Sequence, residues 1–180
     1  MRKTATRYTG MTLVLVMAMV LGACGGEEAE ETTTTVVTAA LIVQADVVSG
    51  PLNIPGDQRA GRVCVLQNRF ARNSEIVWRA RVVDPVSGEQ LDDTALEGVQ
   101  VELADGQVLD MRYGPHPNDN PTDRFWTTSF DIPEDYPTGS LGYEIVATGT
   151  DGRTGSFVQF NVAPSLLTIT DEVYETVEEG

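Results

Sequence analysis

Histidine, cysteine and lysine are almost absent from this chain, and each shortage excludes a class of site. His116 is the only histidine, so a zinc site built from several histidines and a blue-copper site with two are excluded. Cys24 and Cys64 are the only cysteines, so at most one internal disulfide is possible. Every basic residue after Lys3 is arginine.

Motifs of the common hydrolases and nucleotide-dependent enzymes are also missing. The chain has no Gly-x-Ser-x-Gly segment, no phosphate-binding glycine loop and no histidine placed as base for a nucleophile. The acid pairs Asp92–Asp93 and Glu134–Asp135 lie in polar segments, and glycoside cleavage needs a carboxylate geometry that sequence does not show. We expect a protein that is not an enzyme and holds no cofactor.

Positive charge is scarce. Lys and Arg number 12 against 27 Asp and Glu, which gives a formal net charge of −15. Such a surface repels polyanions, so nucleic acid and an anionic bilayer are poor electrostatic partners.

The N-terminus has the pattern of a secretory signal. Arg2, Lys3 and Arg7 precede an apolar run from Met11 to Ala23. As a helix this run would be roughly 20 Å long, which is shorter than the roughly 30 Å hydrocarbon core of a bilayer. A short apolar run behind a basic start is typical of a signal peptide rather than of a permanent span.

The end of that run, Leu21-Gly22-Ala23-Cys24, resembles the lipobox of bacterial prolipoproteins. The resemblance implies cleavage before Cys24, a diacylglyceryl thioether on its sulfur, and anchoring at the extracytoplasmic side of the cell membrane or the outer membrane. Gly25 follows instead of the Asp that commonly retains lipoproteins at the inner membrane, so the choice of membrane stays open. An ordinary secretory signal with a chance cysteine is the alternative.

The rest of the chain divides by composition. Residues 24–40 are acidic and threonine-rich with little to bury, which predicts a disordered tether. Residues 41–170 are the right size for one domain, and 171–180 form an acidic tail.

Short β-like runs fill the predicted domain. Residues 76–84 alternate between apolar and polar, with Ile76 and Trp78 on one face and Arg79 on the other, and the same period recurs in 99–103 and 141–147. Asp105-Gly106 predicts a two-residue hairpin turn. Further strands are expected at 41–48, 63–66, 107–112, 126–132, 156–162 and 166–169. The spacing predicts an antiparallel β-sandwich of 7–9 strands, with a closed barrel as the alternative.

Two resemblances specify the sandwich. Cys64, Trp78 and Tyr143, which stands two residues before Ile145, resemble the cysteine–tryptophan–tyrosine pattern of immunoglobulin domains, with Ile145 in place of the second cysteine. Residues 73–89, 99–103 and 130–146 resemble a macroglobulin-type bacterial immunoglobulin-like domain. The first resemblance implies that Cys64, Trp78 and Ile145 lie together in the core. The second implies an immunoglobulin-like fold and an extracytoplasmic setting, and it carries no information about activity.

Two groups of residues are candidates for binding. Tyr113, His116, Phe125 and Trp126 form a possible ligand or partner surface; since Phe125 and Trp126 must face opposite ways on a strand, one of them is expected to be exposed. Asp119 and Asp123 lie in a loop rich in oxygen ligands that suits Ca²⁺, although Asn, Asp and Pro are also ordinary turn residues.

The leading hypothesis is a lipid-anchored, non-enzymatic immunoglobulin-like module that binds another protein of the cell envelope. The alternative is a surface lipoprotein that binds carbohydrate or Ca²⁺ through the segment from Tyr113 to Trp126.

Overall fold

The computed structural model describes residues 39–116 and 121–177, which form an all-β structure of 11 strands. The strands are β1 (Ile42–Ser49), β2 (Arg69–Arg72), β3 (Glu75–Val83), β4 (Leu96–Leu103), β5 (Val108–Asp110), β6 (Arg112–His116), β7 (Asp123–Asp131), β8 (Gly139–Ser140), β9 (Tyr143–Gly149), β10 (Thr154–Val158) and β11 (Thr168–Val173). Two 3-10 helices, η1 (Gly56–Gln58) and η2 (Ala163–Ser165), lie in connections. Within these two ranges no helix is long and apolar enough to cross a membrane. The predicted signal peptide and Cys24 lie outside the described residues.

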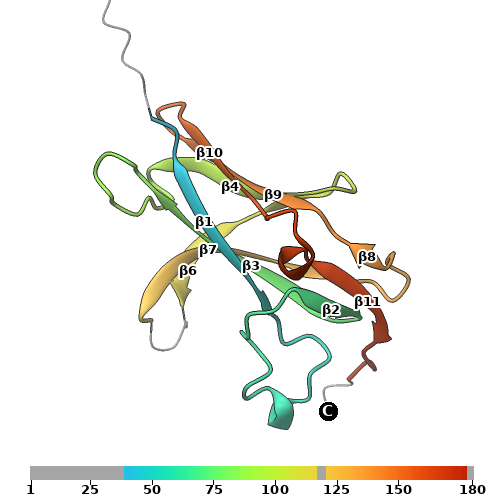
Figure 1. Cartoon of the computed structure of the whole chain (residues 1–180). Helices are drawn as coiled ribbons and strands as arrows, with labels where there is room; N and C mark the ends of the chain where they lie inside the picture. Colours follow the sequence, from blue (N-terminus) through green and yellow to red (C-terminus); the bar gives the residue numbers. More distant parts are fainter. Residues whose placement is uncertain (1–38, 117–120, 178–180) are drawn as a thin grey trace, which may run out of the picture. The chain divides into compact units, whose positions relative to one another are not determined.

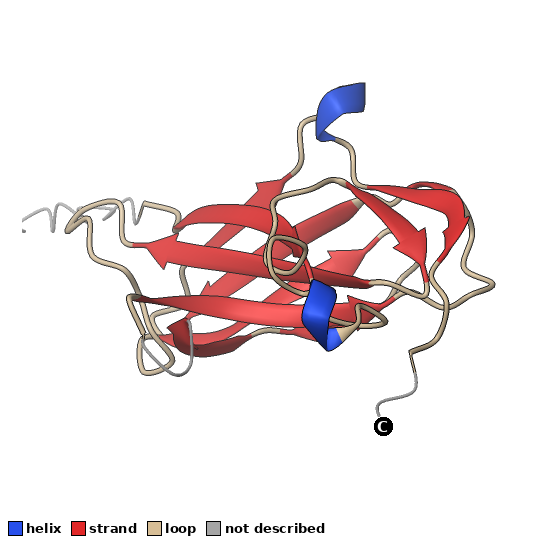
Figure 2. Cartoon of the chain, turned by 90° about the horizontal axis from the view of Figure 1, so that it is seen from below, coloured by secondary structure: helices blue, strands red, loops and turns tan. Residues whose placement is uncertain are grey.

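Two antiparallel four-stranded sheets make the body of the domain (Figures 1 and 2). One has the order β1-β3-β7-β6 and the other the order β10-β9-β4-β5. A third sheet, β2-β11-β8, contains a parallel pair between β2 and β11. The predicted all-β sandwich is confirmed, and because the described strands divide into separate sheets, the closed barrel is wrong.

The strand order bears on the type of sandwich. Immunoglobulin-type sandwiches place strands A, B, E and D in one sheet and C, F and G, with an added C′ in some, in the other. Lettered along the chain, with the short β2 and β8 set aside, the two main sheets follow this order. The third sheet brings the number of strands above the predicted 7–9. The immunoglobulin-like assignment stays a prediction, which this order supports.

The core lies between the two main sheets, where alternation along each strand buries one face. On β3, Ile76, Trp78, Ala80 and Val82 are buried, and on β9 Tyr143, Ile145 and Ala147 are buried. The rings of Trp78 and Tyr143 meet across the sandwich with centroids 5.7 Å apart and planes at 66°. The expected core positions of Trp78 and Ile145 are therefore confirmed.

Cys64 is not in this core, which corrects the prediction. It is exposed and has a backbone φ of 59°. Its segment lies along the outer edge of β1, with Ser49 donating its N–H to Val65 O at 3.0 Å and Gln67 donating to Val47 O at 3.2 Å. Val65 and Leu66 beside it are 40% and 66% exposed, so the apolar side chains of this segment are not covered by a second sheet.

The ends of the strands differ from the prediction at two places. In the β4–β5 hairpin, Leu103 donates its N–H to Gln107 O, so three residues, 104–106, lie between the closing pair rather than the predicted two. Gly106, the last of them, has a φ of 92°. Strand β11, in the third sheet, runs to Val173, three residues past the predicted end of the domain at residue 170. The next residue, Tyr174, donates its N–H to Arg72 O at 2.9 Å.

Candidate functional site

The outer face of the β1-β3-β7-β6 sheet carries an aromatic ring among arginines. Because Trp78, Ala80 and Val82 point into the core, the intervening Arg79 and Arg81 point outward from β3. On the neighbouring β7, Trp126 is buried opposite Ala80, so Phe125 before it points outward as well. The alternation of two paired strands thus brings Phe125 beside both arginines.

Phe125 interacts with three surrounding side chains. The guanidinium carbons of Arg79 and Arg81 lie 5.6 Å and 4.9 Å from its ring centroid, within the range of cation–π attraction. His116, opposite Asp123 in the β6–β7 ladder, meets Phe125 edge-on with ring centroids 5.8 Å apart. These contacts hold the phenyl ring against the sheet and leave it half-buried.

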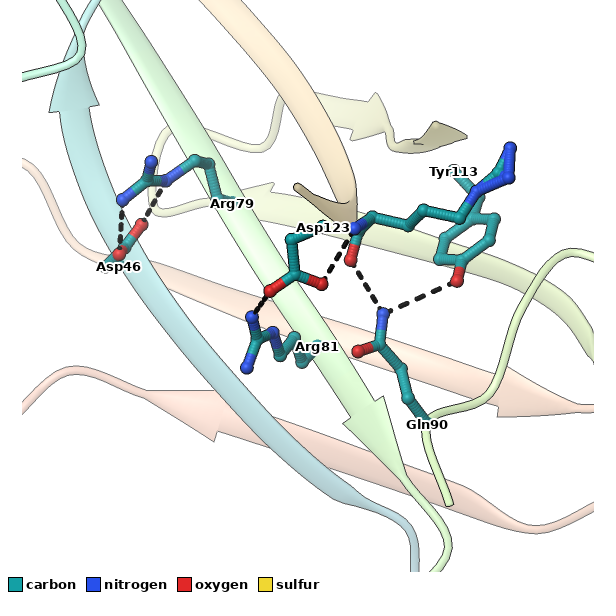
Figure 3. A network of polar contacts seen from close by, with 7 residues as sticks. Asp46, Arg79, Arg81, Gln90, Tyr113 and Asp123 are labelled. Carbon is teal, nitrogen blue, oxygen red and sulfur yellow. Dashed lines mark hydrogen bonds and ion pairs between the residues drawn. The ribbon is translucent and has the colours of Figure 1, made fainter. Parts of the chain in front are cut away.

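Each arginine also forms an ion pair (Figure 3). Arg79 donates from Nε and Nη2 to the two carboxylate oxygens of Asp46 on β1, at 2.8 Å and 2.6 Å. This hydrogen-bonded pairing raises the pKa of Arg79 above its ordinary value, with burial opposing the effect. Arg81 pairs through Nη2 with Asp123 at the start of β7. The aspartates orient the guanidinium groups and neutralise part of their charge.

A shallow hollow of about 330 Å³ opens at these side chains, lined by Gln44, Ala45, Asp46, Arg79, Ala80, Arg81 and Phe125. The Arg81 side chain is 40% exposed, and a guanidinium group offers five donors. The hollow therefore combines an aromatic surface with partly exposed guanidinium groups. That chemistry suits a ligand rich in oxygen acceptors, such as carboxylates, backbone carbonyls or hydroxyl groups.

The four residues of the predicted ligand surface do not form one surface. Trp126 is only 4% exposed, and its Nε1 donates to Leu91 O at 3.2 Å. Tyr113 faces the same way and packs against Trp126 with ring centroids 5.4 Å apart. Only His116 and Phe125 lie on the outer face, so the sheet itself separates the predicted set into two pairs.

The predicted calcium site stays a prediction. Asp119 lies outside the described residues. The carboxylate of Asp123 pairs with Arg81, and its Oδ1 also accepts the N–H of Arg124 at 2.8 Å. In the part of the chain that the structure describes, no group of three or more His, Cys, Asp or Glu side chains is placed to hold a metal ion.

Sequence reasoning missed Arg79, Arg81 and Asp46 as members of the site. The alternation in residues 76–84 already placed both arginines opposite Trp78. Their nearness to Phe125 depends on the β3–β7 register, which pairs Ala80 with Trp126, and no local pattern specifies that register. The chain matches no described protein family, and comparison with curated proteins and with solved structures finds none that is similar to it.

Proposed function

We propose that this chain is a lipid-anchored, non-enzymatic binding domain of the bacterial cell envelope. The basic N-terminus, the apolar run from Met11 to Ala23 and the lipobox-like Leu21-Gly22-Ala23-Cys24 support an acylated Cys24 that faces out of the cytoplasm. An immunoglobulin-like sandwich on a tether is a fold suited to presenting a binding surface away from the membrane.

One observation carries the binding role: Phe125, flanked by Arg79 and Arg81, stands beside an open hollow on a rigid sheet. Aromatic and arginine side chains are the residues most enriched at the energetic centres of protein interfaces. The aspartates that orient both guanidinium groups reduce the entropy lost when a partner binds. We assign the surface to an envelope protein that offers carboxylate or carbonyl oxygens.

Site-specific photo-crosslinking in intact cells tests this assignment. A benzophenone amino acid replaces Thr127, which follows Phe125 at the next outward position of β7 and pairs with Arg79. We expect one predominant protein adduct, lost when Phe125 is changed to Ala and kept in the control Arg69→Gln, an exposed arginine on β2. An adduct that persists in Phe125→Ala, or no adduct at all, contradicts the proposed surface.

The anchor has a separate test. Mass spectrometry of the N-terminal peptide from membrane fractions should find Cys24 as the first residue, carrying a diacylglyceryl group. The Cys24→Ser variant should lack the diacylglyceryl group and keep the uncleaved signal peptide. An unmodified N-terminus beyond residue 24 contradicts the anchor without bearing on the binding surface.

Carbohydrate binding is the second candidate, since a half-buried phenyl ring among polar side chains also suits a sugar ring. Tyr113 and Trp126 pack inward, so Phe125 is the aromatic ring that would contact the sugar. Thermal stabilisation of the purified protein by cell-wall glycan fragments, abolished by Phe125→Ala and without any protein adduct, would favour this candidate over the first.

A further inference from the structure

The outer face of the opposite sheet, β10-β9-β4-β5, has a different character. Its strand registers place Val158 opposite Glu144, Glu144 opposite Glu102, and Glu102 opposite Val108. Directly opposed residues of antiparallel strands share a face. Because Tyr143 and Val101, the neighbours of Glu144 and Glu102, point into the core, this row points outward across all four strands.

Apolar side chains at both ends of the row are left uncovered. Val158 is 60% exposed and Val108 is 54% exposed. Phe160, two residues beyond Val158, is 78% exposed. Between them Gln159 turns the other way, donating from Nε2 to Leu141 O at 3.1 Å and accepting the N–H of Leu167 at 3.0 Å. Those two bonds fix the extended chain past the end of β10, so Phe160 is held outward rather than folded onto the core.

The two glutamates in the row lie directly opposite each other, and no positive charge pairs with either carboxylate among the described residues. Neither Glu102 nor Glu144 has an ion pair or hydrogen bond from its side chain to any described residue. On the other sheet, in contrast, Asp46 and Asp123 each pair with an arginine. Like charges directly opposite each other destabilise a sheet. The free protein therefore carries an electrostatic cost here that a cation from outside would relieve.

We propose that this row, together with Phe160, docks a protein partner whose contact surface places lysine or arginine side chains between apolar ones. The cations would lie over Glu102 and Glu144, and the apolar groups over Val108, Val158 and Phe160. A second copy of the chain is a poor occupant because both copies carry a net charge of −15 before any processing. A basic partner, in contrast, is attracted at long range by the same charge.

The test uses the full chain in neutral maltoside micelles and two fluorescein-labelled peptides of equal length, one alternating valine and lysine, the other alternating valine and glutamate. Fluorescence anisotropy against empty micelles measures binding. We expect the lysine peptide to bind at least about tenfold more tightly than the glutamate peptide at low salt, with the difference shrinking at high salt.

Two test variants and two control variants identify the surface. Phe160→Ser and the double variant Glu102→Gln/Glu144→Gln should each weaken binding of the lysine peptide by about tenfold. Val86→Ser is the matched control, since Val86 is 84% exposed on the β3–β4 connection, away from the row. Phe125→Ala, on the opposite sheet, should leave peptide binding unchanged, which separates this surface from the one proposed above.

Thermal melting shows whether a variant that binds more weakly is still folded. Removing two opposed charges should raise the melting temperature of Glu102→Gln/Glu144→Gln, so weaker binding would accompany greater stability. Equal binding of the two peptides, or equal binding by the parent and the double variant, overturns the proposal. A dimer in sedimentation that Phe160→Ser dissociates also overturns it, because the face would then be covered by a second copy.

Discussion

The two tryptophans of the chain allow a test of how much an unpaired indole N–H costs in the core. Both Trp78 and Trp126 are buried, but only Trp126 has an acceptor for its indole N–H, the carbonyl of Leu91 at 3.2 Å. Trp78 Nε1 is buried without a partner among the described residues. Replacing each by phenylalanine removes the same atoms from the core, so the two variants differ mainly in the fate of that hydrogen bond.

The expected difference follows from the cost of unpaired polar groups. Shrinking either indole to a phenyl ring costs about 1–2 kcal/mol in packing. Trp126→Phe also removes the hydrogen bond from the indole N–H to the Leu91 carbonyl, which adds about 1 kcal/mol. Trp78→Phe removes a buried donor that had no acceptor and regains part of its desolvation cost. We expect Trp78→Phe to be more stable than Trp126→Phe by about 2 kcal/mol.

Urea unfolding of residues 25–180 measures the two free energies of unfolding. Since the chain has 2 tryptophans, each variant keeps one as a fluorescence reporter. Trp78→Ala should cost about 3–5 kcal/mol and shows that the position is a core position. If Trp78→Phe loses as much stability as Trp126→Phe, then the indole N–H of Trp78 is satisfied in the folded protein and the reasoning fails.

Three further predictions concern other parts of the sandwich. Gly155→Ala should destabilise the domain by about 1–3 kcal/mol, because the added Cβ would collide with the carbonyl of Leu41. Gly98→Ala is the control, since a Cβ there would have no atom within 4 Å. The urea midpoints of the two variants measure the difference. Cys64 should react rapidly with a maleimide in the native state, and slow labelling would contradict its exposure. Hydrogen bonds from the Ser87 N–H, the Arg153 side chain and the Val86 N–H lower the pKa of Asp84 from 3.8 to about 2. The ionised Asp84 therefore stabilises the folded domain fully above about pH 4, and this stabilisation is lost as the pH falls towards 2. The difference in melting temperature between the parent and Asp84→Asn should vanish over that window, and a difference that persists at pH 2 would refute the assignment.

Periodicity predicted those parts of the fold in which burial alone decides the structure. Strands β3, β4 and β9 alternate cleanly because one face of each is buried and the other is wet. Strand β2, Arg69–Arg72, has no such signal, since its pairing with the distant β11 supplies its hydrogen bonds. The apolar run at 63–66, in contrast, has the composition of a core strand but is not one. It lies at the edge of a sheet, with a positive φ at an exposed Cys64.

The candidate site was predictable only in part, for a related reason. The sequence required Phe125 and Trp126 to face opposite ways, but not which of them was buried. That choice depends on which face of β7 meets the core, and the pairing of Trp126 with Ala80 decides it. The same register brings Arg79 and Arg81 to Phe125. Long-range pairing therefore assembled a site from residues that local reasoning had treated separately.

The way β1 enters the sandwich has a mechanical consequence. Leu41 donates its N–H to Thr154 O at 3.0 Å, and from there β1 pairs with β3 along its whole length, from Ile42–Val83 to Ser49–Ile76 (Figure 1). With a lipid on Cys24, tension would enter the domain at Leu41. A partner on Phe160, beyond the far end of β10, would pull in the opposite direction along the strands. The β1–β3 hydrogen bonds would then bear the load together in shear, so the sandwich would act as a force-bearing link between the membrane and its partner.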